Sequence, residues 1–316
     1  EHGRSKIAPR NANARVTRRY RPNTLILETR FETAEGTATL IDFMPPRETH
    51  SRLIRMVVGK KGHVALHGEL ILRFGYGATV PWVTRIDDDS SRAIAGPDMV
   101  VLHASVPTHG EDLKTVTDFT VGAGETVSFM LSYELSHRPV PERVDPQERL
   151  RATEKMWTEW VAKNKIKGPW DDAVVRSLIT LKALTYAPTG GMAAAPTTSL
   201  PETIGGERNW DYRYCWLRDA TLTLLSLMNA GYYDEARMWR DWLLRAAAGS
   251  PQQIQIMYGI RGERRLTEWE VPWLPGYEGS QPVRIGNAAH NQLQLDIFGE
   301  VMDALHQARQ GGLGTE

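Results

Sequence analysis

The chain has 316 residues, and its 38 basic and 38 acidic side chains leave no formal net charge at pH 7. This balance gives no electrostatic basis for binding nucleic acid or an anionic membrane surface. No apolar run approaches the roughly 20 residues that span a bilayer. The single cysteine, Cys215, excludes an internal disulfide and a cysteine-based metal cluster. These features are typical of a cytoplasmic protein, and the length favours two domains.

Residues 1–136 have the pattern of short strands joined by polar turns. Apolar and β-branched residues fill Thr24–Phe31 and Thr37–Met44, and Ala34–Gly36 supplies a hairpin turn between them. Further strands are predicted over 52–58, 64–74, 93–96, 99–104, 116–121 and 127–133, with G-K-K-G separating the first two of these. Regularly spaced short strands without a helical period predict an antiparallel β-sandwich.

Residues 137–168 read as a linker that ends in a helix. His137–Pro146 is polar and rich in proline, which is typical of a domain boundary. Asp145 can cap the following helix, which is predicted over Gln147–Lys163 with Pro146 at its start.

Residues 169–316 are predicted to be helical. Helices are expected over 171–186, 218–230, 235–248 and 287–309, and the segment 222–228 is apolar nearly all round, as in a helix buried between others. Long loops rich in aromatic residues and glycine alternate with short turns. Helical hairpins with their long loops on one rim describe an α/α toroid, and four helices form only part of an (α/α)6 ring.

The densest chemistry in the chain lies in Thr197–Asp219, where tyrosines and tryptophans alternate with arginines and aspartates. Flat aromatic faces can cover the C–H faces of a sugar ring, while carboxylates and guanidinium groups bind its hydroxyls. The alternative is a loop whose aromatic rings are core and whose charges form a surface ion pair. The density of both residue types favours binding of a polyhydroxylated ring.

Three motifs together resemble bacterial glycoside hydrolase family 15, the glucoamylase and trehalase group. They read T-T-S-L-P-E-x-I-G-G-x-R-N-W-D-Y-R-Y-C-W-L-R-D-A, G-E-R-R-L-T-E-W-E-V-P-W-L-P-G-Y-E-G-S and P-V-R-I-G-N-A-A-x-N-Q. The resemblance covers nearly the whole chain and implies a trehalase-like N-terminal β-sandwich followed by the first part of an (α/α)6 barrel. Because the chain starts at Glu1 and ends in G-G-L-G-T-E, we expect a family member truncated at both ends.

The resemblance implies inverting hydrolysis of α-glucosidic bonds, in trehalose or in α-1,4 and α-1,6 glucosides. One glutamate protonates the leaving oxygen, and a second activates a water on the opposite face of the sugar. The two carboxyl groups lie roughly 6.5–9.5 Å apart, which leaves room for that water. No metal and no organic cofactor are implied, and the expected partner is a small or oligomeric α-glucoside. The oligomeric state is not indicated.

The resemblance also implies which residues bind the sugar. Arg218 and Asp219 match an Arg–Asp pair that contacts the ring, Tyr212 and Trp216 match aromatic residues beside it, and Arg284 matches a substrate-contacting loop arginine. Position in the same motifs adds four more predicted binding residues: Asp211, Trp273, Tyr277 and Asn287.

The family's catalytic glutamates are expected beyond residue 316. The family's general acid lies in a segment like W-E-V-R-G, whereas Trp269–Val271 is followed by P-W-L-P-G and precedes the last predicted helix. Glu268 and Glu270 are therefore predicted to be loop carboxylates, although each stays a candidate for the acid.

Three functions remain open from the sequence. The chain is part of an inverting α-glucosidase, or a carbohydrate-binding or structural protein that lacks the catalytic glutamates, or an enzyme of another toroidal family that shares only the architecture. The matched motifs weigh against the third, since architecture alone would not reproduce them.

Overall fold

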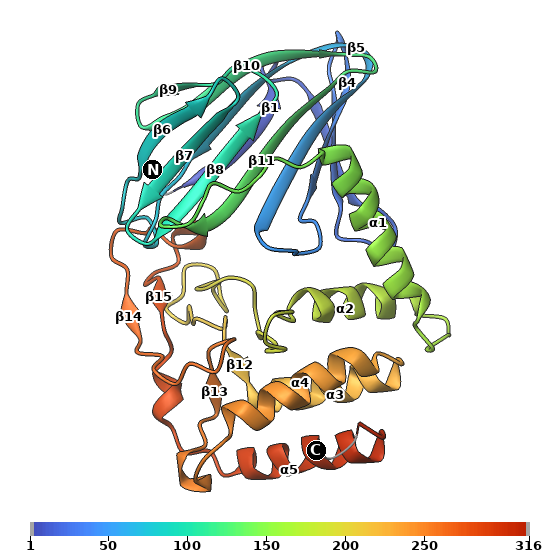
Figure 1. Cartoon of the computed structure of the whole chain (residues 1–316), viewed down its shortest axis with the longest axis vertical. Helices are drawn as coiled ribbons and strands as arrows, with labels where there is room; N and C mark the ends of the chain where they lie inside the picture. Colours follow the sequence, from blue (N-terminus) through green and yellow to red (C-terminus); the bar gives the residue numbers. More distant parts are fainter. Residues whose placement is uncertain (1–2, 314–316) are drawn as a thin grey trace. The chain divides into compact units, whose positions relative to one another are not determined.

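The computed structural model describes residues 3–313, so Glu1 and Glu316 lie outside the described part (Figure 1). The chain divides into two compact units, one ending at Trp160 and the other beginning at Val161. Helix α1 (Pro146–Ala162) therefore belongs almost entirely to the first unit. No helix in the described residues is long and apolar enough to cross a membrane.

The first unit is an antiparallel strand assembly, which confirms the strand-rich prediction for this half. Its strands are β1 (Arg4–Pro9), β2 (Arg15–Tyr20), β3 (Leu27–Glu32), β4 (Gly36–Phe43), β5 (Ser51–Ile71), β6 (Trp82–Asp87), β7 (Ser90–Ala95), β8 (Asp98–Ala104), β9 (His109–Glu111), β10 (Lys114–Gly122) and β11 (Thr126–Leu135). They pair in the order β2-β3-β4-β5-β11-β8-β7-β6, while β1 and β10 also pair with β5, and β9 pairs with β10.

Strand β5 corrects the prediction that G-K-K-G separates two strands. The chain runs through Gly59–Gly62 as one strand of 21 residues, with an irregular register opposite Thr37 and Ala38. Gly62 has a φ of 60°, and a Cβ there would overlap the carbonyl oxygen of Glu35. A glycine in the left-handed region therefore bends the strand without a hairpin.

The bend lets β5 serve two layers of strands. Its first part pairs with β4 and β11, and its second part pairs with β1 and β10. One apolar core draws on both layers and contains Phe31, Leu66 and Phe129, all buried. A second core includes Ile54 and Leu150, so α1 packs against the strands.

The second unit contains the helices α2 (Asp171–Ala183), α3 (Leu217–Asn229), α4 (Tyr233–Ala246) and α5 (Asp296–Gln310). Its short strands pair as β12 (Cys215–Trp216) with β13 (Met257–Tyr258) and β14 (Trp269–Glu270) with β15 (Arg284–Ile285). Single helical turns lie at η1 (Pro251–Gln253), η2 (Tyr277–Gly279) and η3 (Ala288–Asn291).

The last helix begins later than predicted. We expected it from Asn287, but α5 starts at Asp296. The side chain of Asn287 accepts a hydrogen bond from the amide of Ala289 and caps η3, and Gln292 then returns to extended backbone with a ψ of 140°. The capped turn ends before the regular helix starts.

Two buried tryptophans of α4 pack against the segment that contains β13. Trp239 and Trp242 of α4 stack with ring centroids 4.6 Å apart, and Tyr258 meets Trp242 edge-on at 6.0 Å. The Trp242 indole donates to the carbonyl of Ile260 at 3.0 Å, which satisfies its buried N–H.

Helix α3 is not buried all round as expected, because Leu222 is 61% exposed.

Candidate functional site

The segments 197–216 and 284–287 are joined by side-chain hydroxyls. Thr198 Oγ1 and Ser199 Oγ donate to the carbonyl of Arg284 at 2.6 and 3.0 Å. The amide of Arg284 donates back to Ser199 Oγ at 2.8 Å. The backbone of β15 is therefore fixed to a loop that lies about 85 residues earlier in the chain.

Asp211 forms a second junction between the same segments. Its side chain is fully buried, and its two oxygens accept from the backbone and guanidinium of Arg213 at 2.7–3.1 Å, from Tyr214 Oη at 3.2 Å and from the amide of Gly286 at 3.1 Å. Its carbonyl accepts from Asn287 Nδ2 at 3.1 Å. Both predicted binding residues, Asp211 and Asn287, are thus engaged with protein groups.

Four predicted residues gather around the start of α3. The rings of Tyr212 and Trp216 lie 6.0 Å apart and tilted by 56°. Trp216 belongs to the short extended strand β12, and Arg218 and Asp219 follow in the first turn of α3, where an acidic side chain is favourable. Burial raises the pKa of Tyr212, and the carboxylates of Glu202 and Asp219 raise it further.

Arg218 pairs with a residue that sequence reasoning missed. Its Nη1 lies 3.1 Å from Oδ2 of Asp296, the first residue of α5, and both side chains are 49% exposed. A small hollow beside this pair is lined by Trp216, Arg218, Ile256, Gln294, Asp296 and Ile297. The sequence did not indicate Asp296, because the helix predicted over 287–309 places this residue inside the helix rather than at its start.

Arg284 lies between an aromatic ring and two carboxylates. Its guanidinium carbon is 4.6 Å from the centroid of the Trp210 ring, and Nη1 donates to the carbonyl of Glu207 at 2.7 Å. Glu268 and Glu270 each approach the guanidinium to 3.6 Å. Both glutamates therefore flank Arg284, which is only 13% exposed.

Trp273 and Tyr277 lie in the loop between β14 and β15. The Trp273 ring is 6.2 Å from that of Trp269, and Trp273 and Tyr277 are 41% and 56% exposed. Two partly exposed indoles side by side offer an aromatic surface of the kind that sugars stack on.

Cys215 is a buried core residue, as predicted. Its side chain is fully buried, and burial raises the pKa of its thiol strongly. A thiol in this state supplies no nucleophile. Within residues 3–313 there is no cluster of three His, Cys, Asp or Glu side chains that could hold a metal ion.

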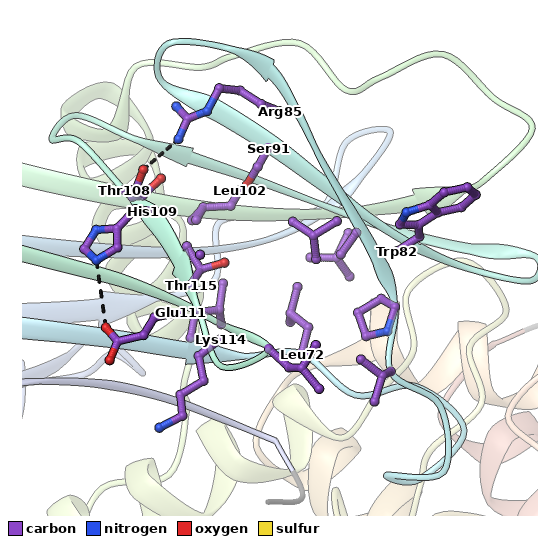
Figure 2. Close-up of a pocket in the computed structure, with 18 of the residues that line it drawn as sticks. Leu72, Trp82, Arg85, Ser91, Leu102, Thr108, His109, Glu111, Lys114 and Thr115 are labelled. Atoms are coloured by element: carbon purple, nitrogen blue, oxygen red, sulfur yellow. Dashed lines mark hydrogen bonds and ion pairs between the residues drawn. The ribbon is translucent and has the colours of Figure 1, made fainter.

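A cavity of about 480 Å³ lies in the first unit (Figure 2). Leucines and valines line much of it, Trp82 is 82% exposed, and Arg85 Nη2 donates to the carbonyl of Thr108 at 2.6 Å. None of the predicted site residues lines it.

Comparisons with known proteins agree with the family resemblance. Residues 168–315 match the model of the glycosyl hydrolases family 15. The chain is 34% identical to the trehalase of Mycolicibacterium smegmatis, over 96% of this chain and 50% of that protein. It is 32% identical to trehalase 1 of Sulfolobus acidocaldarius, over 96% of this chain and 52% of that protein.

A solved bacterial glucoamylase complexed with acarbose has a similar fold. The TM-score is 0.57 at 12% identity, over 83% of this chain and 44% of that one. The chain spans about half the length of the curated relatives that it matches. The match at the level of sequence goes beyond a shared architecture: residues 168–315 carry the sequence of a glycosyl hydrolase family 15 domain, and the chain as a whole is similar to trehalases.

Proposed function

We propose that this chain forms the sugar-binding part of a glycosidase that hydrolyses α,α-trehalose with inversion. The observation that carries the proposal is the group of Tyr212, Trp216, Arg218 and Asp219 at the start of α3. This group lies in the family-matched region of a chain that is similar to two trehalases along 96% of its length. The names of these relatives favour trehalose over the α-1,4 and α-1,6 glucosides.

The helices of the second unit are proposed to be part of an (α/α)6 toroid. The likeness of fold to a bacterial glucoamylase supports this architecture. In the family, two carboxylates complete the active site, and we expect both after residue 316. Glu268 and Glu270 are assigned a supporting role beside Arg284 instead.

Each group around α3 offers a distinct interaction with one glucosyl ring. Tyr212 and Trp216 supply apolar ring faces, and Asp219 supplies acceptors for two hydroxyls. Arg218 donates N–H groups while Asp296 fixes its guanidinium on the other side.

The chemistry then needs one acid and one base. The acid gives a proton to the bridging oxygen as the bond from C1 to that oxygen breaks. The base takes a proton from a water whose oxygen bonds to C1 from the opposite face. The attacked glucose leaves as the β anomer, while the other glucose keeps its α configuration.

Proton NMR of the products tests this proposal, because anomers can be observed before they interconvert. A protein that extends this chain through the two expected carboxylates is mixed with trehalose, maltose or isomaltose, and the anomeric signals are followed from the first minutes. We expect equal initial amounts of α- and β-glucose from trehalose and slower or no cleavage of the other two. Release of α-glucose alone from trehalose would show retention and contradict the assignment. Binding of trehalose without any cleavage would instead support the non-catalytic alternative.

A further inference from the structure

The carboxylate of Asp211 has no room for a sugar hydroxyl. It is fully buried, and five N–H and O–H groups of the protein already donate to its two oxygens. Buried charges are stable only when they are paired and hydrogen-bonded, and the guanidinium of Arg213 meets this carboxylate with two donors at 2.9 and 2.7 Å. The Asp211 carboxylate therefore serves as an acceptor for groups of the protein itself.

What Asp211 holds is the end of β15. The amide of Gly286 donates to the carboxylate, and Asn287 Nδ2 donates to the carbonyl of the same aspartate. On the opposite side the backbone of Thr267 is so close that a Cβ at Gly286 would overlap its carbonyl oxygen. The chain at Gly286 is thus confined between Asp211 and Thr267, and its φ of 80° suits only glycine well.

The residue that depends on this confinement is Arg284. Its backbone is fixed by Thr198 and Ser199, and its guanidinium lies over Trp210, the residue just before Asp211. On the other side of Asp211, Tyr212 follows directly and approaches Trp216. One buried carboxylate therefore lies between the segment that carries the arginine and the segment that carries the stacking rings.

We propose that Asp211 is a positioning residue that acts through Arg284. It holds β15 in register with the loop of Tyr212, so that the guanidinium and the aromatic rings form one preorganised surface, and it does not touch the sugar itself. Small displacements of such groups lower activity by about 10- to 100-fold. The inference rests on the proposed function, because the sugar contacts of Arg284 and Tyr212 are part of that proposal.

A double-mutant cycle tests it. Asp211→Asn keeps the shape of the side chain but removes its charge and turns one acceptor into a donor. This change, Arg284→Ala and the double variant are compared for the affinity for trehalose by calorimetry, and for kcat/KM wherever cleavage is observed. Asp234→Asn serves as the control, since Asp234 is an aspartate in the first turn of α4 with a side chain that is 74% exposed.

Each single variant is expected to weaken trehalose binding by about 10- to 100-fold, and the double variant to bind about as weakly as Arg284→Ala alone. A residue that only stabilised the fold would lower the folded fraction equally in both backgrounds, so the two losses would multiply. Multiplying losses therefore overturn the proposal, as does wild-type affinity in Asp211→Asn. The control should bind like the wild type.

Two further measurements keep the test decisive. If Asp211→Asn loses its cooperative melt, Tyr214→Phe replaces it in the cycle, since it removes only one hydroxyl donated to the Asp211 carboxylate, and multiplying losses again overturn the proposal. If the wild type binds no trehalose, the proposed function fails on its own. Hydrogen exchange then judges the positioning role: the Gly286 amide should exchange faster in Asp211→Asn than in the control, and equal exchange would overturn it.

Discussion

Asp219 and Arg218 are neighbours in the sequence but have different partners in the structure. Arg218 reaches across to Asp296 on α5, so Asp219 is not held by an ion pair with its neighbour. The carboxylate of Asp219 instead acts on the phenol of Tyr212. An exposed acceptor beside an aromatic ring is well placed to receive sugar hydroxyls.

Replacing Asp219 by alanine should therefore affect sugar binding much more than stability. A site built to hydrogen-bond a hydroxyl loses several kcal/mol when the acceptor is removed. In the protein that includes the two expected carboxylates, kcat/KM for trehalose should therefore fall by at least about 100-fold. The melting temperature should change little because Asp219 is exposed. Enzyme assays and thermal melts of Asp219→Ala and Asp234→Ala check this. Near wild-type activity in Asp219→Ala would show that Asp219 does not bind the sugar.

The same carboxylate makes the ionisation of Tyr212 a probe of the site. Burial and the carboxylates of Glu202 and Asp219 raise the pKa of Tyr212 above its ordinary value of 10.0. Because the folded-state pKa is raised, any stability linked to this group is present below pH 10 and is lost as the pH rises through the folded-state value.

Asp219→Asn should lower the pKa of Tyr212, since one negative charge that opposes ionisation is gone. The pKa of Tyr212 is measured from ultraviolet difference spectra of tyrosinate during an alkaline titration. The same titration of Tyr212→Phe is subtracted to remove the signal of the other tyrosines. Glu263→Gln is a control, since Glu263 acts on Cys215 rather than on Tyr212. An unchanged midpoint of the Tyr212 titration in Asp219→Asn would show that the Asp219 carboxylate does not act on Tyr212.

At the scale of elements, the path of strand β5 depends on the backbone conformation of one glycine. One strand reaches two layers only because Gly62 takes a φ of 60° next to the backbone of Glu35. Gly96 has nearly the same φ of 59° but open space around its missing Cβ. Substituting each glycine therefore distinguishes the free-energy cost of the left-handed conformation from the additional cost of steric overlap.

Gly96→Ala is expected to lower the free energy of unfolding by about 1 kcal/mol, from the left-handed conformation alone. Gly62→Ala should lower it by more, at about 2–4 kcal/mol, because the added methyl must also displace the backbone of Glu35. Denaturant unfolding of the two variants compares them directly. Equal losses would mean that the strand relaxes around the new side chain.

The elements that sequence reasoning found are those with a buried face. Strands β4 and β11 are rich in buried apolar residues and were predicted with nearly correct ends. Strands β2 and β6 are exposed throughout, so no alternation marks them. The helical pattern ran through 287–295 because that segment contains no glycine or proline, and only the cap at Asn287 ends the turn.

The candidate site was predicted in the same uneven way. Motifs located Tyr212 and Arg284, and the structure adds their aromatic and charged neighbours. The pairing of Arg218 with Asp296 joins residues 78 positions apart, so no local pattern reports it. The burial of Asp211 was equally hidden, since an aspartate is ordinarily a surface residue.

At the scale of the whole molecule, the second unit exposes large apolar side chains. Leu222 of α3 and Met302 of α5 are 61% and 67% exposed, and Leu293 and Leu295 before α5 are each 77% exposed. Exposed apolar side chains in such number mark surfaces that other protein surfaces cover.

We therefore expect the 316-residue chain to self-associate. Light scattering after size-exclusion chromatography should show species larger than the 35.5 kDa monomer, increasing with concentration. Replacing Leu222 and Met302 by glutamine should shift the chain towards the monomer. Leu113→Gln should not, because this 70% exposed leucine belongs to the first unit. A cooperatively melting wild-type monomer would contradict the expectation.

The burial of Cys215 makes the chain convenient for site-specific labelling. It is the sole cysteine, and its thiol is both inaccessible and weakly acidic. A cysteine introduced at Tyr277, in the aromatic loop, would be the one sulfur that reacts with a maleimide dye. A fluorophore at that position would report sugar binding at the proposed site through a change in its emission, without removal of any native residue from the core.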